Sequence, residues 1–89
     1  MPKVRQSERF FKDYLTLDTT LQDDTDSAIK TFVENPRYPS LHFKKMQGHK
    51  NRYEMRVNDA YRITLEKAAG EKGVYILRRV GPHDILKNP

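Results

Sequence analysis

The stretch that decides the fold reads Tyr53-Glu54-Met55-Arg56-Val57-Asn58-Asp59-Ala60-Tyr61-Arg62-Ile63-Thr64-Leu65-Glu66. Apolar and polar side chains alternate in both halves, which is the period of two expected of a β-strand with one buried face. The triplet Asn58-Asp59-Ala60 between the halves is typical of a tight turn. The segment therefore predicts an antiparallel hairpin with strands over residues 53–58 and 61–66.

The polar face of this hairpin concentrates charge. Glu54 and Arg56 point to the same side of the first strand, away from its apolar residues. Antiparallel pairing brings Arg62 across from both of them. His83 follows in the C-terminal segment. Two guanidiniums, a carboxylate and an imidazole on one sheet face suit the chemistry of phosphates.

Further strand patterns flank the hairpin. Leu41 begins a short alternating run before it, and a loop rich in glycine over residues 69–73 follows it. Residues 74–80 form an apolar run that is typical of another strand, which Gly81-Pro82 ends. We therefore expect an antiparallel meander of three or four strands in the second part of the chain.

The first part of the chain has helical patterning. Residues 2–6 are short and suit an edge strand, and Ser7 is placed to cap a helix whose apolar face recurs at helical spacing. A loop over residues 16–20 leads to a second helix, which ends before Asn35-Pro36. Aspartates at positions 23, 24 and 26 lie near its expected start, where the helix dipole favours negative charge.

These elements predict one α+β domain over residues 1–89. The apolar faces of the two helices need a partner, and a sheet is the only other element that the chain offers. The expected fold is a short N-terminal strand and a helical hairpin packed on a twisted antiparallel sheet. A chain of this length buries only roughly 60% of its unfolded surface, so it has one modest core.

Composition excludes several classes of protein. The chain has no cysteine, which removes disulfides, thiolate metal sites and cysteine nucleophiles. It has no apolar run of about 18 residues, so we expect no membrane association and a cytoplasmic location. The net charge is +5, and the basic residues concentrate after residue 34. Such a balance indicates either a nucleic-acid partner or only a solvated basic surface.

The ordered motifs resemble the RelE/ParE toxins of bacterial type II toxin–antitoxin systems. The similar stretches are Leu41-His42-Phe43-Lys44-Lys45-Met46-Gln47-Gly48, Tyr53-Glu54-Met55-Arg56-Val57 leading to Tyr61-Arg62-Ile63, and Val80-Gly81-Pro82-His83-Asp84-Ile85. With the preceding helices they cover nearly the whole chain in the order of the family. The resemblance implies a small toxin that an antitoxin wraps, and that in many members cuts messenger RNA in the ribosomal A site without a metal ion.

The resemblance also implies site residues. Members of this kind place a basic residue at the position of Arg56, an arginine at that of Arg62 and a histidine or arginine at that of His83. The chain departs from the pattern at Glu54, where lysine is frequent. It also lacks the tyrosine common near the C-terminus, since Ile85-Leu86-Lys87 stands there.

Metal-free cleavage of RNA needs a base, cations and an acid, and the chain offers a group for each. Arg56 and Arg62 present planar forks that match phosphate oxygens, so we expect them to clamp the scissile phosphate. His83 is the candidate acid for the departing 5′-oxygen. Glu54 is either the base that takes the 2′-hydroxyl proton or a salt-bridge partner that positions Arg56 or Arg62.

Other basic residues flank this expected cleft and suit contacts to backbone phosphates. They are Lys44, Lys45, Lys50 and Arg52. Strand alternation places Arg78 and Arg79 on opposite faces, so we expect only one of them at the cleft, and Arg79 is nearer to His83. The tyrosines at 53, 61 and 75 either stack bases or belong to the core. No spacing typical of a metal site occurs, and we expect no cofactor.

Three functions remain open at this point. The first is an endoribonuclease toxin that acts on messenger RNA and the ribosome, with a cognate antitoxin as partner. The second is a non-catalytic inhibitor of DNA gyrase of the ParE type, in which His83 would be replaceable. The third is a non-catalytic module that binds RNA or an antitoxin.

Overall fold

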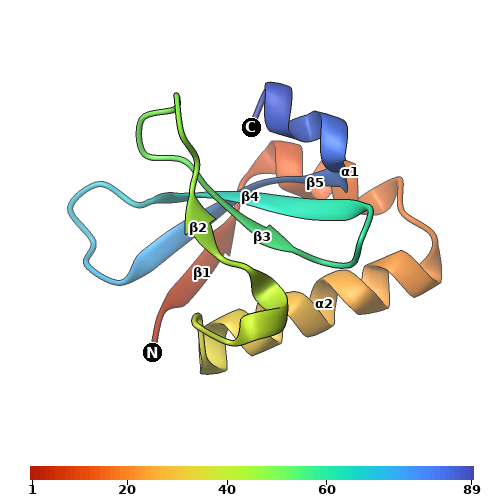
Figure 1. The fold of residues 1–89 in the computed structure, drawn as a ribbon, viewed down its shortest axis with the longest axis horizontal. Helices are drawn as coiled ribbons and strands as arrows, with labels where there is room; N and C mark the ends of the chain where they lie inside the picture. Colours follow the sequence, from red (N-terminus) through yellow and green to blue (C-terminus); the bar gives the residue numbers. More distant parts are fainter.

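The computed structural model describes residues 1–89 and has two layers, with α2 on one side of a five-stranded sheet (Figure 1). The elements are β1 (Lys3–Gln6), α1 (Glu8–Leu15), α2 (Thr19–Glu34), the 3-10 helix η1 (Pro39–Leu41), β2 (Lys44–Lys45), β3 (Tyr53–Arg56), β4 (Tyr61–Lys67), β5 (Val74–Pro82) and the 3-10 helix η2 (His83–Lys87). The strand order is β1-β5-β4-β3-β2. The predicted α+β class, with a helical pair and a hairpin in the second part of the chain, is confirmed.

The sheet differs from the expected meander in its first strand. β1 lies at one edge and pairs parallel with β5, with Lys3 opposite Val74, whereas all other pairs are antiparallel. The predicted antiparallel meander is confirmed for β2 to β5, and the predicted edge position of the first strand is confirmed for β1, which adds one parallel pair to the sheet. Two strands also end at other residues than predicted: β3 stops at Arg56 and β5 continues through Pro82.

The helices begin at side-chain caps. The Ser7 hydroxyl accepts a hydrogen bond from the backbone N–H of Phe10, as its position predicted. For α2 the cap is Asp18, whose carboxylate accepts from the N–H of Leu21. The aspartates expected at the start of this helix lie beyond its first turn, because α2 begins at residue 19. The Tyr14 hydroxyl donates to Asp26 and joins the two helices.

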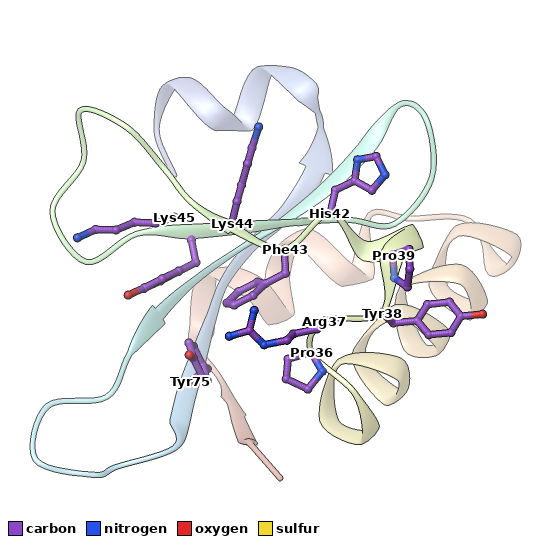
Figure 2. Close-up of a pocket in the computed structure, with 10 residues that line it drawn as sticks. Pro36, Arg37, Tyr38, Pro39, His42, Phe43, Lys44, Lys45 and Tyr75 are labelled. Carbon is purple, nitrogen blue, oxygen red and sulfur yellow. The ribbon is translucent and has the colours of Figure 1, made fainter.

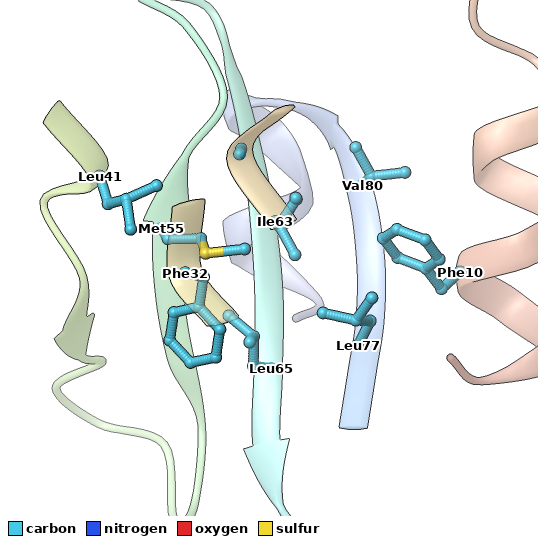
Figure 3. Packing of buried hydrophobic residues seen from close by; sticks show 9 residues of the cluster. Phe10, Phe32, Leu41, Met55, Ile63, Leu65, Leu77 and Val80 are labelled. Carbon is cyan, nitrogen blue, oxygen red and sulfur yellow. The ribbon is translucent and has the colours of Figure 1, made fainter. Parts of the chain in front are cut away.

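The core lies between α2 and the sheet, and α1 extends it along β5 (Figure 3). Its fully buried members include Phe32 from α2 and Met55, Ile63 and Leu65 from β3 and β4. Each such side chain contributes about 1.5–3 kcal/mol by leaving water. The alternation predicted for the hairpin is confirmed, because these residues share one face. None of the helices has both the length and the apolar character needed to cross a bilayer.

A β-bulge interrupts the pairing of β4 with β5. Thr64 pairs with Arg79 and Leu65 pairs with Leu77, so Arg78 is an extra residue in β5. The guanidiniums of Arg78 and Arg79 consequently reach two successive carbonyls, those of Pro89 and Asn88, at 3.4 Å each. The expectation that these two arginines lie on opposite faces is wrong, because a bulge breaks strict alternation.

Candidate functional site

The candidate site lies on the face of the sheet that is turned away from α2, which we call the open face. Figure 1 shows α2 and η2 on opposite sides of the sheet. A Cβ atom added at Gly81 would lie 2.8 Å from Cγ2 of Ile85, so η2 packs directly on β5 at this position. The 3-10 helix therefore covers one end of the open face and leaves the β3 and β2 side uncovered.

The cross-strand register brings Arg56, Arg62 and Gly81 into one row. Arg56 pairs with Arg62 across β3 and β4, and Arg62 pairs with Gly81 across β4 and β5. Neighbouring strands lie about 4.8 Å apart, so this row spans roughly 10 Å. His83 follows two residues after Gly81 as the first residue of η2, and it is exposed. Arg56 and Arg62 thus come from neighbouring strands, and His83 comes from the helix that directly follows the third strand of the row.

Arg62 is partly committed to the hairpin turn. Its Nη1 donates to the carbonyl oxygens of Asn58, Asp59 and Tyr61, at 2.7, 3.2 and 3.0 Å. These bonds fold the guanidinium back toward the turn. A guanidinium has five N–H donors and Nη1 carries two of them, so Nε and Nη2 keep about three donors for an anion.

Arg56 has only a weak counter-ion. Its Nη1 lies 3.8 Å from the carboxylate of Asp59, which is fully exposed, and solvent screens such a pair. The Nε of Arg56 is buried and has no hydrogen-bond partner. Arg56 also borders a hollow of about 320 Å³ between α2 and the end of β3. Because Arg56 and Arg62 are directly opposed like charges, an anion bound between them would relieve their repulsion.

Glu54 is a free carboxylate on the same face. It pairs in register with Thr64 on β4 and with Lys44 on β2. Arg56 pairs with Asp59, and Glu54 has no ion pair within 4.0 Å. Glu54 therefore forms no salt bridge that would position Arg56 or Arg62.

The expected phosphate-binding residues divide into two groups. Lys44, Lys45 and Lys50 are exposed and free of ion pairs, so they are available to an anionic partner. In contrast, Arg52 lies 3.9 Å from Glu66, which Arg78 also contacts.

Arg79 is more enclosed than Arg52 and Arg56. Its Nε donates to Asp13 of α1 at 3.1 Å, and its side chain is only 19% exposed. The same carboxylate accepts from the backbone N–H of Val80 at 3.2 Å. Asp13 thus joins α1 to β5 where β1 no longer covers that strand edge.

Sequence patterns missed these carboxylate partners. Asp13 lies on the polar face of its predicted helix, and its partner Arg79 is 66 residues away in sequence. Glu66 lies at a polar position of its predicted strand, and its partner Arg78 is 12 residues away. No group of three or more His, Asp or Glu side chains is arranged to hold a metal ion.

Solved structures of toxins have the same architecture. YafQ from E. coli strain BL21(DE3) matches with a TM-score of 0.75 over 97% of this chain and 98% of its own, at 13% identity. The YoeB/ParE toxin from Agrobacterium tumefaciens matches with a TM-score of 0.73 over 91% of this chain and 98% of its own, also at 13% identity. A chain of the intact E. coli RelBE toxin–antitoxin complex matches with a TM-score of 0.69 over 92% of this chain and 96% of its own, at 22% identity. This chain has the RelE toxin fold.

The RelE fold is what these similarities establish. No protein-family model and no curated protein matches the sequence. At 13–22% sequence identity, the solved structures share the architecture of this chain, but most of their side chains differ. The resemblance seen in the ordered motifs is confirmed for the RelE fold over nearly the full length of the chain.

Proposed function

We propose that this chain is the toxin of a toxin–antitoxin system and that it cleaves messenger RNA in the ribosomal A site without a metal ion. The fold similarity supports the class of protein, since YafQ, YoeB/ParE and RelE toxins share the architecture. The row formed by Arg56, Arg62 and Gly81 supports the chemistry. This row is the observation that carries the proposal, because two cationic residues are directly opposed in register on the open face.

In the proposed reaction the carboxylate of Glu54 removes the proton from the 2′-hydroxyl. The 2′-oxygen then attacks phosphorus, forms a 2′,3′-cyclic phosphate and displaces the 5′-oxygen, which takes a proton from His83. Arg56 and Arg62 stabilise the negative charge of the pentacoordinate phosphorane. Each proton transfer contributes typically 10²–10⁴-fold to the rate. The free carboxylate of Glu54 and the three open donors of Arg62 support these assignments.

Replacing both Arg62 and His83 tests the proposal. We expect the double variant Arg62→Ala, His83→Ala to remain folded and to lose at least about 10³-fold in cleavage, since it removes a phosphate clamp and an acid. The measurement is mapping of RNA ends after induction in cells, together with cleavage on purified ribosomes with and without EDTA.

Lys12→Ala is the matched control, because Lys12 is exposed on α1 and pairs only with Glu8. A folded double variant that cuts RNA or arrests growth as well as the original chain contradicts the proposal. Growth arrest accompanied by altered DNA supercoiling, with intact messenger RNA, points instead to gyrase inhibition.

An antitoxin is the proposed partner. The exposed lysines around β2 and the uncovered part of the open face suit an acidic or amphipathic segment by charge matching. We expect a neighbouring reading frame to encode such a protein and its co-expression to restore growth. Co-expression that leaves the arrest unchanged contradicts the assignment of that protein as the partner.

A further inference from the structure

A second hollow lies on the α2 side of the sheet, away from the open face. Its volume is about 460 Å³, and it opens between the segment after α2 and the β2 edge of the sheet. Its lining residues are Pro36, Arg37, Tyr38, Pro39, His42, Phe43, Lys44, Lys45, Tyr53 and Tyr75. The proposed cleavage chemistry uses none of its aromatic residues.

Three aromatic rings form two walls of this hollow at nearly right angles. The rings of Phe43 and Tyr53 are 5.5 Å apart and lie within 17° of parallel. The Tyr75 ring stands at 85° and 87° to them, with centroids 5.8 Å away. Buried Phe32 packs edge-on against both Phe43 and Tyr75 and fixes them from the core. The core therefore holds the aromatic walls in place, and the Lys67 ammonium lies over the Tyr53 ring, 5.5 Å from its centroid.

The charged side chains around these rings are all cationic. Arg37, Lys44 and Lys45 line the hollow, no carboxylate does, and none of the three has an ion pair. Figure 2 shows the guanidinium of Arg37 pointing toward the side where Phe43 and Tyr75 lie, while Lys44 and Lys45 extend outward. A planar guanidinium can stack on a base or bind a phosphate.

We propose that this hollow binds one nucleotide of single-stranded RNA, with the base against the aromatic walls and its phosphate near Arg37. The proposal rests on the proposed function in taking RNA as the ligand, and it adds a contact outside the cleavage chemistry. Aromatic planes beside unpaired cations are the combination that single-stranded nucleic acids bind without regard to sequence.

The position of β2 connects the two sites. Lys44 pairs in register with Glu54, which belongs to the open face, whereas Lys45 pairs with Tyr53, which lines the hollow. β2 is the edge strand, so no further strand separates the two faces there. An RNA strand that crosses this edge reaches the hollow with one nucleotide while another lies over Arg56 and Arg62.

Binding of two probes to the full chain tests the proposal. The probes are adenosine 5′-monophosphate and a 2′-O-methylated RNA hexamer, which cannot be cut because its attacking hydroxyl is blocked. We expect both to shift the NMR resonances of Phe43, Tyr53 and Tyr75. The hexamer should bind at least about tenfold more tightly, because its other phosphates meet the neighbouring lysines.

Variants locate the contact. Arg37→Ala should weaken hexamer binding about tenfold, and Tyr75→Leu, which keeps apolar bulk without the flat ring, should weaken it about fivefold. Arg37 is exposed, so its replacement does not disturb the packing of the core. Lys12→Ala removes the same charge from α1 and should change the affinity less than twofold.

This binding test does not depend on whether the chain cleaves RNA. The folded Arg62→Ala, His83→Ala variant should still bind adenosine 5′-monophosphate in the hollow, and this result is expected even if the original chain cuts no RNA. Equal losses in the Arg37→Ala and Lys12→Ala variants overturn the proposal, as do unshifted aromatic resonances. Equal affinity for the mononucleotide and the hexamer overturns the assignment of RNA as the ligand.

Discussion

At the residue scale, the arginines of the sheet differ in what they are free to do. Arg79 is enclosed by Asp13 and a C-terminal carbonyl, whereas Arg62 gives one nitrogen to the hairpin turn and keeps the rest. A residue already paired at low exposure stabilises the fold, and its replacement acts on stability before it acts on chemistry. Charge type alone therefore does not identify the functional cations.

Asp13 provides a test of this division. Asp13→Ala should lower the free energy of unfolding by about 2 kcal/mol, because it removes the carboxylate partner of Arg79 and leaves the N–H of Val80 without its acceptor. The measurement is urea denaturation followed by circular dichroism. Glu8→Ala on the same helix removes an exposed carboxylate paired with Lys12, and should change stability by less than about 0.5 kcal/mol. Equal effects of the two replacements would refute a structural role for Asp13.

Gly81 is constrained by space and not by backbone conformation. A Cβ atom there would come within 2.8 Å of Ile85, so Gly81→Ala should destabilise the chain by about 1–3 kcal/mol through overpacking. Adding Ile85→Ala should make the double variant less destabilised than the sum of the single effects. A double-mutant cycle in urea measures this, and strict additivity would exclude the clash.

At the element scale, the elements that could be predicted from the sequence are those with local signals. The features that could not be predicted depend on pairing between residues far apart in the chain. The β3–β4 hairpin and both helices follow from periodicity and caps within a few residues. The parallel pairing of β1 with β5 joins residues about seventy positions apart, and no local pattern encodes it. The bulge at Arg78 likewise depends on a partner strand, so alternation alone misplaced one arginine.

A side-chain pair helps to hold β1 next to the loop that precedes β5. The two terminal nitrogens of the Arg5 guanidinium, Nη1 and Nη2, donate to Glu71, and this hydrogen bonding holds the pKa of the Glu71 carboxyl below its ordinary value. A carboxyl with a lowered pKa in the folded state adds stability above its ordinary pKa. That contribution is lost as the pH falls through the lowered value.

An NMR titration of the Glu71 carboxyl carbon tests this pair. We expect the lowered pKa in the original chain and its return to the ordinary value in Arg5→Ala. Arg9→Ala serves as control, because Arg9 pairs with Asp13 and not with Glu71. An unchanged Glu71 pKa in Arg5→Ala would show that another group causes the shift.

At the scale of the whole molecule, the two faces of the sheet have different tasks. The α2 side contains the core, and the open face carries the proposed cleavage residues. The fold and the common face of Glu54, Arg56 and Arg62 were predictable, because strand alternation fixes both. The counter-ions were not predictable, because they depend on which elements meet. The hollow at residues 36–45 was missed for the same reason, since Arg37 gives no signal in sequence.

The free lysines of β2 should dominate the salt dependence of RNA binding. For single strands the slope of log K against log salt changes by about 0.7 for each phosphate contact. The double variant Lys44→Ala, Lys45→Ala should therefore reduce the slope by about 1.4 with the non-cleavable hexamer. The control double variant Lys12→Ala, Lys30→Ala removes the same charge from the helices. An equal reduction of the slope in this control would show that only the net charge of the protein matters and not the position of the β2 lysines.

The parallel pairing of β1 with β5 also bears on how the protein is made. During synthesis the N-terminal strand emerges early, yet its partner is translated about seventy residues later. Until then β1 has no place in the sheet, and Arg62 lacks its neighbour on β5. Non-local contacts of this kind form late and slow down folding. A nascent chain halted before β5 therefore lacks both the partner strand of β1 and the strand that completes the row formed by Arg56, Arg62 and Gly81.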